Sequence, residues 1–286
     1  MTSKGIKKAL TAKINDWIDH VEDENIKKVI RDNAIVTGGA IVSLLCNETP
    51  HDYDVYFKTF ESCLAVAKYY ANQWNKMHPD KSQVKIEVDD ATGRIKCFIQ
   101  STGVASEGEN ETDPEVSEPD NDSAQDKPKY RPKYFSTNAI SLSDKIQLVI
   151  RFYGSVDDIH KNYDFVHCTC SFDVKTSVVN LPARALEAIL NKELYYCGSK
   201  YPLCSIIRSR KFIQRGWSIN AGQYLKMCLQ LNDLDLKDLD VFADQLAGVD
   251  SAYFSQAIDM IRKRKEDDPG FTVDNTYLFE IINRIF

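Results

Sequence analysis

Residues 36 to 57, VTGGAIVSLLCNETPHDYDVYF, constrain the fold more than any other stretch of the chain. A short apolar run ends at Gly38 and Gly39, and a helix-compatible stretch and a polar turn follow. A strand-like segment then carries Asp52 and Asp54. Because side chains alternate between the two faces of a strand, both carboxylates share one face. The pattern predicts a strand, a glycine turn, a short helix and a second strand with two neighbouring acids.

Two carboxylates side by side repel each other unless a positive charge lies between them. The expected occupant is a hard divalent cation, Mg2+ (or Mn2+), carried by a nucleoside triphosphate (NTP). Gly38 and Gly39 allow the backbone to approach a ligand closely, and the start of the next helix offers free N–H groups to phosphate. Acid pairs also occur by chance on solvated strand edges, but the glycine turn upstream favours a site for phosphoryl or nucleotidyl transfer. Ser43, on the predicted helix, joins the nucleotide-binding candidates.

The glycine turn and the acid pair resemble the nucleotidyltransferase superfamily of DNA polymerase beta, poly(A) polymerases and CCA-adding enzymes. The resemblance covers about twenty-two residues and indicates a divergent member. It implies an α+β fold, in which a nucleotidyltransferase palm of about four or five mixed strands precedes an all-helical C-terminal domain. It also implies Mg2+-dependent transfer of a nucleoside monophosphate (NMP) from an NTP to a hydroxyl acceptor. An RNA 3′ end is the first candidate for this acceptor.

Members of this superfamily usually place a third acid on a neighbouring strand. Residues 162 to 173, NYDFVHCTCSFD, are expected to form such a strand, and they contain Asp164 and Asp173. Asp164 is the preferred catalytic and metal-binding candidate, because compact side chains accompany it and the segment resembles one in CCA-adding enzymes. Asp173 better suits a turn, and the sequence leaves open that neither acid serves. Asp89 and Asp90 are poorer candidates because they fall in a predicted hairpin turn.

Residues 206 to 217, IIRSRKFIQRGW, concentrate positive charge on a predicted helix that ends at a glycine. Arg208, Lys211 and Arg215 share one face, which is either simply solvated or a clamp for phosphate. The stretch resembles the arginine-bearing helix that follows the catalytic domain of CCA-adding and bacterial poly(A) polymerases. This resemblance implies that the three residues bind nucleotide. The family arginine close after the diglycine is absent. An acidic-plus-arginine template that selects the base is not recognisable either, so the resemblance does not extend to addition of a specific triplet.

An acidic segment interrupts the predicted catalytic domain. Residues 103 to 126 contain nine acids and no base, and subtracting them from the net charge of −6 leaves +3 for the rest of the chain. Such a composition cannot bury enough apolar surface to offset chain entropy, so we predict a disordered insertion over residues 103–132. The insertion is either a solvated spacer or a nucleic-acid mimic that shields a basic cleft.

The pattern along the chain changes from strands to helices near residue 180. We therefore predict a nucleotidyltransferase catalytic domain over residues 1–180 and a helical domain over residues 181–286. His51 and His167 are interpreted as structural or rim residues. The eight cysteines are scattered without C-x2-C pairs, which favours buried thiols in a reducing cytoplasm over zinc sites. No run approaches the roughly 20 apolar residues of a membrane span, so no membrane partner is expected.

Two other functions remain compatible with the sequence. In one, the fold has lost activity and serves as a binding or structural module. In the other, the chemistry is kept but the acceptor is a protein or a small molecule. The sequence indicates neither the preferred base nor the oligomeric state.

Overall fold

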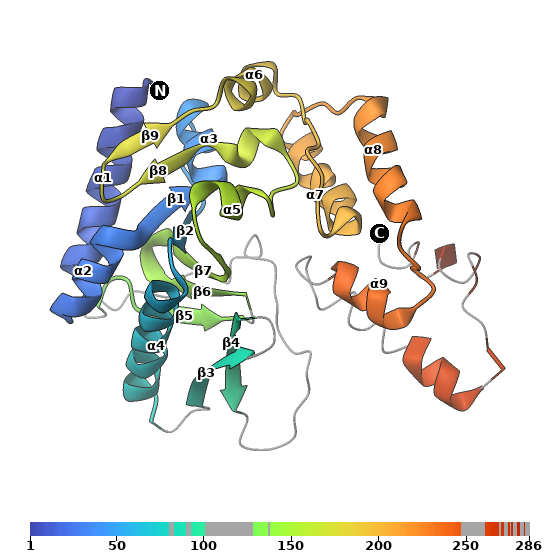
Figure 1. Cartoon of the computed structure of the whole chain (residues 1–286), viewed down its shortest axis with the longest axis horizontal. Coiled ribbons are helices and arrows are strands. Elements are labelled where there is room, and N and C mark those ends of the chain that lie inside the picture. Colours follow the sequence, from blue (N-terminus) through green and yellow to red (C-terminus); the bar gives the residue numbers. More distant parts are fainter. Residues whose placement is uncertain are drawn as a thin grey trace. The chain divides into compact units, whose positions relative to one another are not determined.

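The computed structural model describes residues 1–79, 83–89, 93–100, 128–136, 138–246 and 261–268, together with residues 270, 271, 274, 276, 279, 280 and 283. The predicted acidic insertion lies outside these residues except for its end, 128–132. That end is not disordered as expected, because Tyr130 is buried and a strand begins at Pro132. The described residues divide into two compact units, one up to Tyr195 and one from Tyr196 (Figure 1).

The first unit is built on a seven-stranded mixed sheet with the order β5-β6-β7-β2-β1-β8-β9. Its strands are β1 (Ala34–Thr37), β2 (Tyr53–Phe57), β5 (Pro132–Phe135), β6 (Ala139–Leu142), β7 (Ile146–Tyr153), β8 (Ser171–Asp173) and β9 (Val178–Asn180). The buried strand β1 is antiparallel to both β2 and β8, whereas β2 is parallel to β7. The α+β fold class is confirmed. The sheet is larger than the predicted four or five strands because β5 and β6 extend one edge and β8 and β9 the other.

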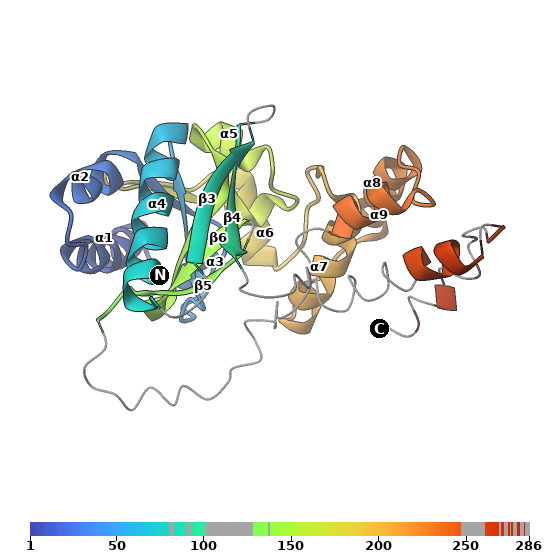
Figure 2. The same ribbon diagram turned by 90° about the horizontal axis from the view of Figure 1, so that it is seen from below.

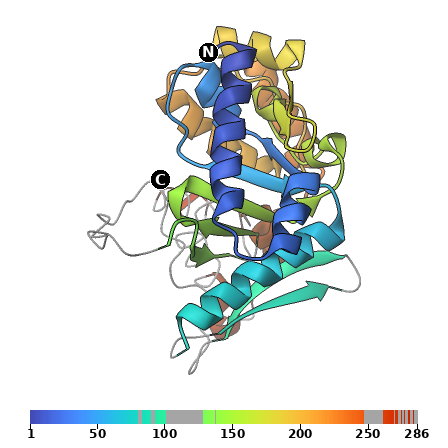
Figure 3. The ribbon, with the colours of Figure 1, turned by 90° about the vertical axis from the view of Figure 1, so that its left-hand side faces the viewer.

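Helices cover both faces of this sheet. The helices of this unit are α1 (Ser3–Asp19), α2 (Glu24–Asn33), α3 (Gly39–Leu45), α4 (Phe60–Met77), α5 (Val156–His160) and α6 (Ala183–Asn191), with the 3-10 helices η1 (Ser143–Lys145) and η2 (Val166–Thr169), and α6 packs on η2. Figure 3 shows α1, α2 and α4 together on one face, and Figure 2 shows α5 on the other side of the strands. There Ile159 of α5 packs in one core cluster with Ile35 of β1 and Tyr56 of β2.

The first helices have the local signals that the physics of helix termini requires. In α1 a stripe of apolar residues at spacings of three and four is buried, namely Ile6, Leu10, Ile14, Trp17 and Ile18. The α2 N-cap is Asp23, whose carboxylate accepts hydrogen bonds from two backbone N–H groups of the first turn. Helix α4 begins with a capping box formed by Thr59 and Ser62. These signals explain why the sequence locates all three helices.

A separate two-stranded sheet consists of β3 (Gln83–Asp89) and β4 (Arg94–Gln100), which form the predicted antiparallel hairpin. Asn75 of α4 extends this sheet with its side chain. Its Nδ2 donates to the Val84 carbonyl at 2.9 Å, and its Oδ1 accepts from the Val84 N–H at 2.8 Å. These bonds fix the hairpin to α4, and the hydroxyl of Tyr153 in β7 also donates to the Gly93 carbonyl of the hairpin turn at 3.2 Å.

The strand predicted over residues 162–173 is wrong over most of its length. Only Ser171–Asp173 form a strand, while Val166–Thr169 form η2. The hydroxyl of Thr169 donates to the Val166 carbonyl at 2.7 Å, a local bond that competes with strand pairing. Asp164 precedes η2 and is buried.

The second unit contains α7 (Pro202–Gln214), α8 (Ala221–Asn232) and α9 (Leu239–Leu246), and its regular structure is helical within the described residues. The units divide later than the predicted boundary at residue 180. One reason is that the Val166 N–H in η2 donates to the Tyr195 carbonyl, which holds the chain after α6 in the first unit. Within the described part of the chain, no helix is long and apolar enough to cross a bilayer.

Candidate active site

The glycine turn after β1 adopts a conformation that requires glycine. Gly38 has φ +88° and ψ −145° and is the N-cap of α3. A Cβ at this position would lie 3.3 Å from Oδ2 of Asp54 and 3.5 Å from the hydroxyl oxygen of Tyr163. Gly39 is exposed, and a Cβ there would meet no atom within 4 Å. The turn therefore brings backbone, an acid and a tyrosine hydroxyl together beside open space.

The acid pair lies where β2 begins. Asp52 directly precedes the strand, and Asp54 is its second residue. By the alternation along a strand, Asp54 shares a face with Tyr56, which packs against α5. Burial, and after it the charge of Asp52, raises the pKa of Asp54 above its ordinary value. The geometry confirms that the two carboxylates interact and that Asp54 adjoins the glycine turn.

Gln147 of β7 completes this arrangement, and sequence reasoning missed it. In the parallel pairing of β2 with β7, Gln147 is the register partner of Asp54. With its amide nitrogen facing the acids, Gln147 donates to Asp54 Oδ1 at 3.2 Å and to Asp52 Oδ2 at 3.1 Å. One signal was available in the sequence. Gln147 interrupts an otherwise apolar strand, IQLVI, and an inward polar residue of this kind needs a polar partner.

Tyr163 is the second residue that the sequence did not reveal. Its hydroxyl forms a hydrogen bond with Thr37, the last residue of β1. Burial, then Tyr56 and then Asp54 raise the pKa of Tyr163 well above its ordinary value, so the phenol stays protonated. The Thr37 hydroxyl donates to the Cys170 carbonyl at 2.8 Å and lies 2.8 Å from Nε2 of His160. This hydrogen-bond network holds Thr37, the residue directly before the glycine turn, in place.

Neither Asp164 nor Asp173 joins the acid pair as the predicted third metal ligand. Asp164 lies near His167, where its charge opposes the lowering of the histidine pKa by burial. Asp173 forms an ion pair with Lys58 at 2.6 Å and pairs with Ile35 in the sheet. Among the described residues, no group of three or more His, Cys, Asp or Glu side chains is placed to hold a metal ion. The expected triad with Asp164 is therefore not assembled, because residues 162–169 do not form a strand.

The donor set nevertheless fits one magnesium ion. Mg2+ is typically bound by one or two carboxylates together with substrate phosphates, and it keeps several waters. Asp52 and Asp54 supply the two carboxylates, and the amide of Gln147 adjoins both. The side of the site toward Gly39 is open, as a phosphate ligand would require.

The remaining candidates lie elsewhere. Ser43 is a partly buried residue of α3. In the second unit, Lys211 and Arg215 are exposed and Arg208 is partly buried, and their role in nucleotide binding stays a prediction. In the first unit, Lys145 was missed. It donates at 3.1 Å to the carbonyl of Pro50, in the turn that leads to Asp52.

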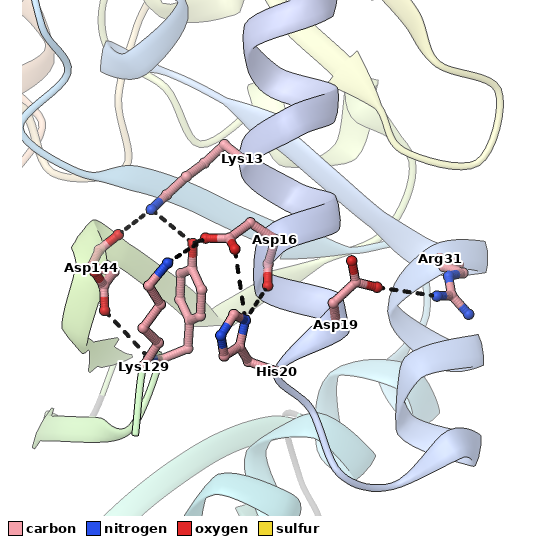
Figure 4. Close-up of polar contacts among 8 residues, drawn as sticks. Lys13, Asp16, Asp19, His20, Arg31, Lys129 and Asp144 are labelled. Atoms are coloured by element: carbon pink, nitrogen blue, oxygen red, sulfur yellow. Dashed lines mark hydrogen bonds and ion pairs between the residues drawn. The ribbon is translucent and has the colours of Figure 1, made fainter. Parts of the chain in front are cut away.

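A second polar cluster lies at the opposite face of β2 (Figure 4). Nζ of Lys13 donates to the Asp144 carbonyl at 2.5 Å and to the Tyr130 hydroxyl at 3.1 Å, and it lies 5.5 Å from the centre of the Tyr53 ring. The Tyr130 hydroxyl donates to Asp16 at 2.6 Å. That hydrogen bond is the largest cause that lowers the pKa of Asp16.

A strand, a glycine turn, a short helix and an acid-bearing strand thus follow one another within the mixed sheet. Residues 8–192 match the Gabija anti-defense 2 family. The chain belongs to that family.

Comparison with known proteins gives one curated relative and several solved structures. The relative, "Gabija anti-defense 2" of Bacillus phage SPbetaL7, is 19% identical over 281 residues, which cover 95% of this chain and 57% of the relative. The chain thus spans little more than half of that protein. The Thermotoga maritima CCA-adding enzyme complexed with tRNA is 12% identical with a TM-score of 0.40, covering 91% of this chain and 57% of the enzyme. The Bacillus stearothermophilus CCA-adding enzyme in complex with CTP is 10% identical with a TM-score of 0.37, covering 86% of this chain and 51% of the enzyme.

Proposed function

We propose that this chain is a Mg2+-dependent nucleotidyltransferase that transfers an NMP from an NTP to a hydroxyl acceptor, with an RNA 3′ end as the first candidate. The observation that supports this most is the approach of Asp54 to the glycine turn. The 3.3 Å between Oδ2 of Asp54 and the Cβ position of Gly38 leaves room for glycine and for little else. A phosphate-binding backbone and a cation-binding acid pair thereby share one site.

Each residue of the site has a role in this function. Gly38 and Gly39 let the triphosphate approach the backbone, and Asp52 and Asp54 hold Mg2+. When bound, the cation neutralises charge on the phosphate oxygens. The hydroxyl of Tyr163 stays protonated beside Asp54, so it adds no further negative charge next to the acid pair. The acceptor hydroxyl attacks the α-phosphorus in line, the bond to the β-phosphate oxygen breaks so that pyrophosphate leaves, and the hydroxyl proton passes to water.

The biological setting follows from the family. The curated phage relative bears the name Gabija anti-defense 2, and we propose that this chain also counteracts the Gabija defence. Arg208 and Lys211 of α7, and Arg215 at its C-cap, would then bind phosphate groups of the nucleotide or of the RNA acceptor. Lys211 and Arg215 are exposed, and exposed cationic side chains are suited to such contacts.

A second function has one specific observation in its favour. Gln147, a neutral residue, adjoins the acid pair from the neighbouring strand. A site with only two acids can bind a magnesium–nucleotide without transferring it. In that case the chain would act by binding nucleotide alone.

The two functions are separated by a transfer assay. The purified chain is incubated with each labelled NTP and Mg2+, with and without RNA. The first function predicts labelled RNA that is lost in Asp54→Asn and kept in Asp157→Asn, which changes an exposed acid of α5. Full incorporation by Asp54→Asn would contradict it, and nucleotide binding without product would favour the second function.

The anti-defence part has its own test. Bacteria that carry Gabija are infected while they express either the wild type or the variant with Asp52→Asn and Asp54→Asn. We expect plaques to appear with the wild type only. Equal protection of phage by the variant would show that the acid pair is not needed.

A further inference from the structure

The number of cations that this site can hold is decided by the strands on either side of β2. On one side β1 ends at Thr37, and Gly38 approaches Asp54. On the other side β7 presents Gln147 in register with Asp54. Neither β1 nor β7 carries a further carboxylate in register with Asp54. Within the described residues, no third acid, histidine or cysteine joins the pair as a metal ligand.

The orientation of Gln147 is fixed by its strand. Its neighbours Ile146 and Leu148 are both 1% exposed, and they are the register partners of Tyr53 and Val55. Since side chains alternate along a strand, Gln147 must point to the face that carries the acids. A slip by one residue would bury the amide and expose two large apolar side chains. The strand register therefore fixes the amide of Gln147 next to the acid pair.

The amide can serve the site in two orientations. Its two N–H groups face one carboxylate each, at 3.1 and 3.2 Å, which separates the two negative charges without a cation. A half-turn of the same amide would place its oxygen in the same position, and amide oxygens are ligands for hard cations. One side chain could thus stabilise both the empty and the loaded acid pair.

We propose that Gln147 takes the position of a third carboxylate, so that the site binds a single divalent cation together with its nucleotide. This inference rests on the proposed function. Its reason is charge: two carboxylates match one divalent cation, whereas a second cation about 4 Å away needs further negative ligands. Gln147→Glu supplies that ligand in the register position next to Asp54. It converts the site into one that holds two cations.

The test is a titration of the full chain with Mn2+ in the presence of the α,β-methylene analogues of the four NTPs. Bound Mn2+ is counted by electron paramagnetic resonance, which needs no turnover. We expect one Mn2+ per wild-type chain and two per Gln147→Glu chain. Gln73→Glu on α4 makes the same change of charge elsewhere and is expected to keep one. Gln147→Met, which keeps the length of the side chain and removes the amide, is expected to lower the affinity for the single ion by about 10-fold.

The outcomes separate this inference from the proposed function. Two Mn2+ per wild-type chain, or one per Gln147→Glu chain with unchanged affinity, would overturn the inference and leave the proposed function standing. Wild type that binds no Mn2+ with any of the nucleotides would overturn both. A thermal unfolding transition for each variant shows whether it is folded.

Discussion

The two faces of β2 carry polar clusters that differ in how their carboxylate charges are compensated. On the face toward α1, Asp16 accepts a hydrogen bond from Tyr130 and lies 3.4 Å from Lys129, so its charge is compensated within the protein. On the face toward α5, the charges of Asp52 and Asp54 are separated only by a neutral amide. The pKa of Asp16 is lowered and that of Asp54 is raised. In the first cluster the protein itself compensates the carboxylate charge. In the second cluster a bound cation is needed to compensate the two carboxylates.

The largest expected effect concerns ligand binding by these two clusters. Asp54→Asn should lower the affinity for Mg2+–NTP by about 100-fold or more, about 2.7 kcal/mol, because it removes one of the two charges that hold the cation. Asp16→Asn should leave this affinity unchanged, although it also removes a carboxylate close to β2. Isothermal titration calorimetry with Mg2+ and nucleotide measures both. An equal loss of affinity for Mg2+–NTP in the two variants would contradict the proposed difference between the two faces of β2.

A buried ionisable group away from both clusters gives the next largest effect. Burial lowers the pKa of His167 to about 4, below its ordinary value of 6.5. The unfolded chain therefore takes up a proton at pH values where the folded protein does not. The stability from neutral His167 is present above pH 6.5 and is lost as the pH falls toward 4, by at most about 3 kcal/mol.

The measurement is the free energy of unfolding from denaturant titrations between pH 7 and pH 4.5. His167→Gln should flatten the decline in stability, while His51→Gln, at an exposed position, should not. An unchanged slope in His167→Gln would mean that another group causes the acid sensitivity.

The glycine turn gives an intermediate effect. Gly38→Ala forces a side chain into φ +88° and places a Cβ 3.3 Å from the Asp54 carboxylate, so it should cost about 1 to 2 kcal/mol of stability. It should also displace Asp54 and weaken nucleotide binding. Gly39 begins a helix, needs no positive φ and faces open space, so Gly39→Ala should leave the stability unchanged or raise it by up to about 1 kcal/mol. Thermal unfolding of the two variants makes the comparison, and equal costs would show that the approach of Asp54 is not tight.

The smallest expected effect concerns the polar cluster around Asp16, on the face of β2 toward α1. Tyr130→Phe removes the hydroxyl that donates to Asp16 and accepts from Lys13, which should cost about 1 kcal/mol of stability. Nucleotide affinity should not change, because the cluster faces away from the acid pair. Tyr134→Phe, at a ring that is 40% exposed, is the matched control. A loss of nucleotide affinity in Tyr130→Phe would mean that the two faces of β2 are coupled.

The sequence predicted those features that depend on neighbouring residues. Gly38 and the pair Asp52 and Asp54 follow from local backbone geometry and from the period of a strand, and the structure places them as predicted. Gln147 could not be located, because its contact with Asp54 depends on a parallel pairing between segments far apart in the chain. The strand predicted for Asp164 failed because local hydrogen bonds fold residues 166–169 into a 3-10 helix.

A double-mutant cycle with Gly38→Ala and Asp52→Asn tests most directly whether the glycine turn and the acid pair bind one ligand together. The affinity for NTP is measured by calorimetry with Mg2+ and with EDTA, for the wild type, both single variants and the double variant. We predict binding that requires Mg2+, and a double variant that loses clearly less than the sum of the two single losses. Binding that persists in EDTA, or losses that simply add, would contradict a shared site.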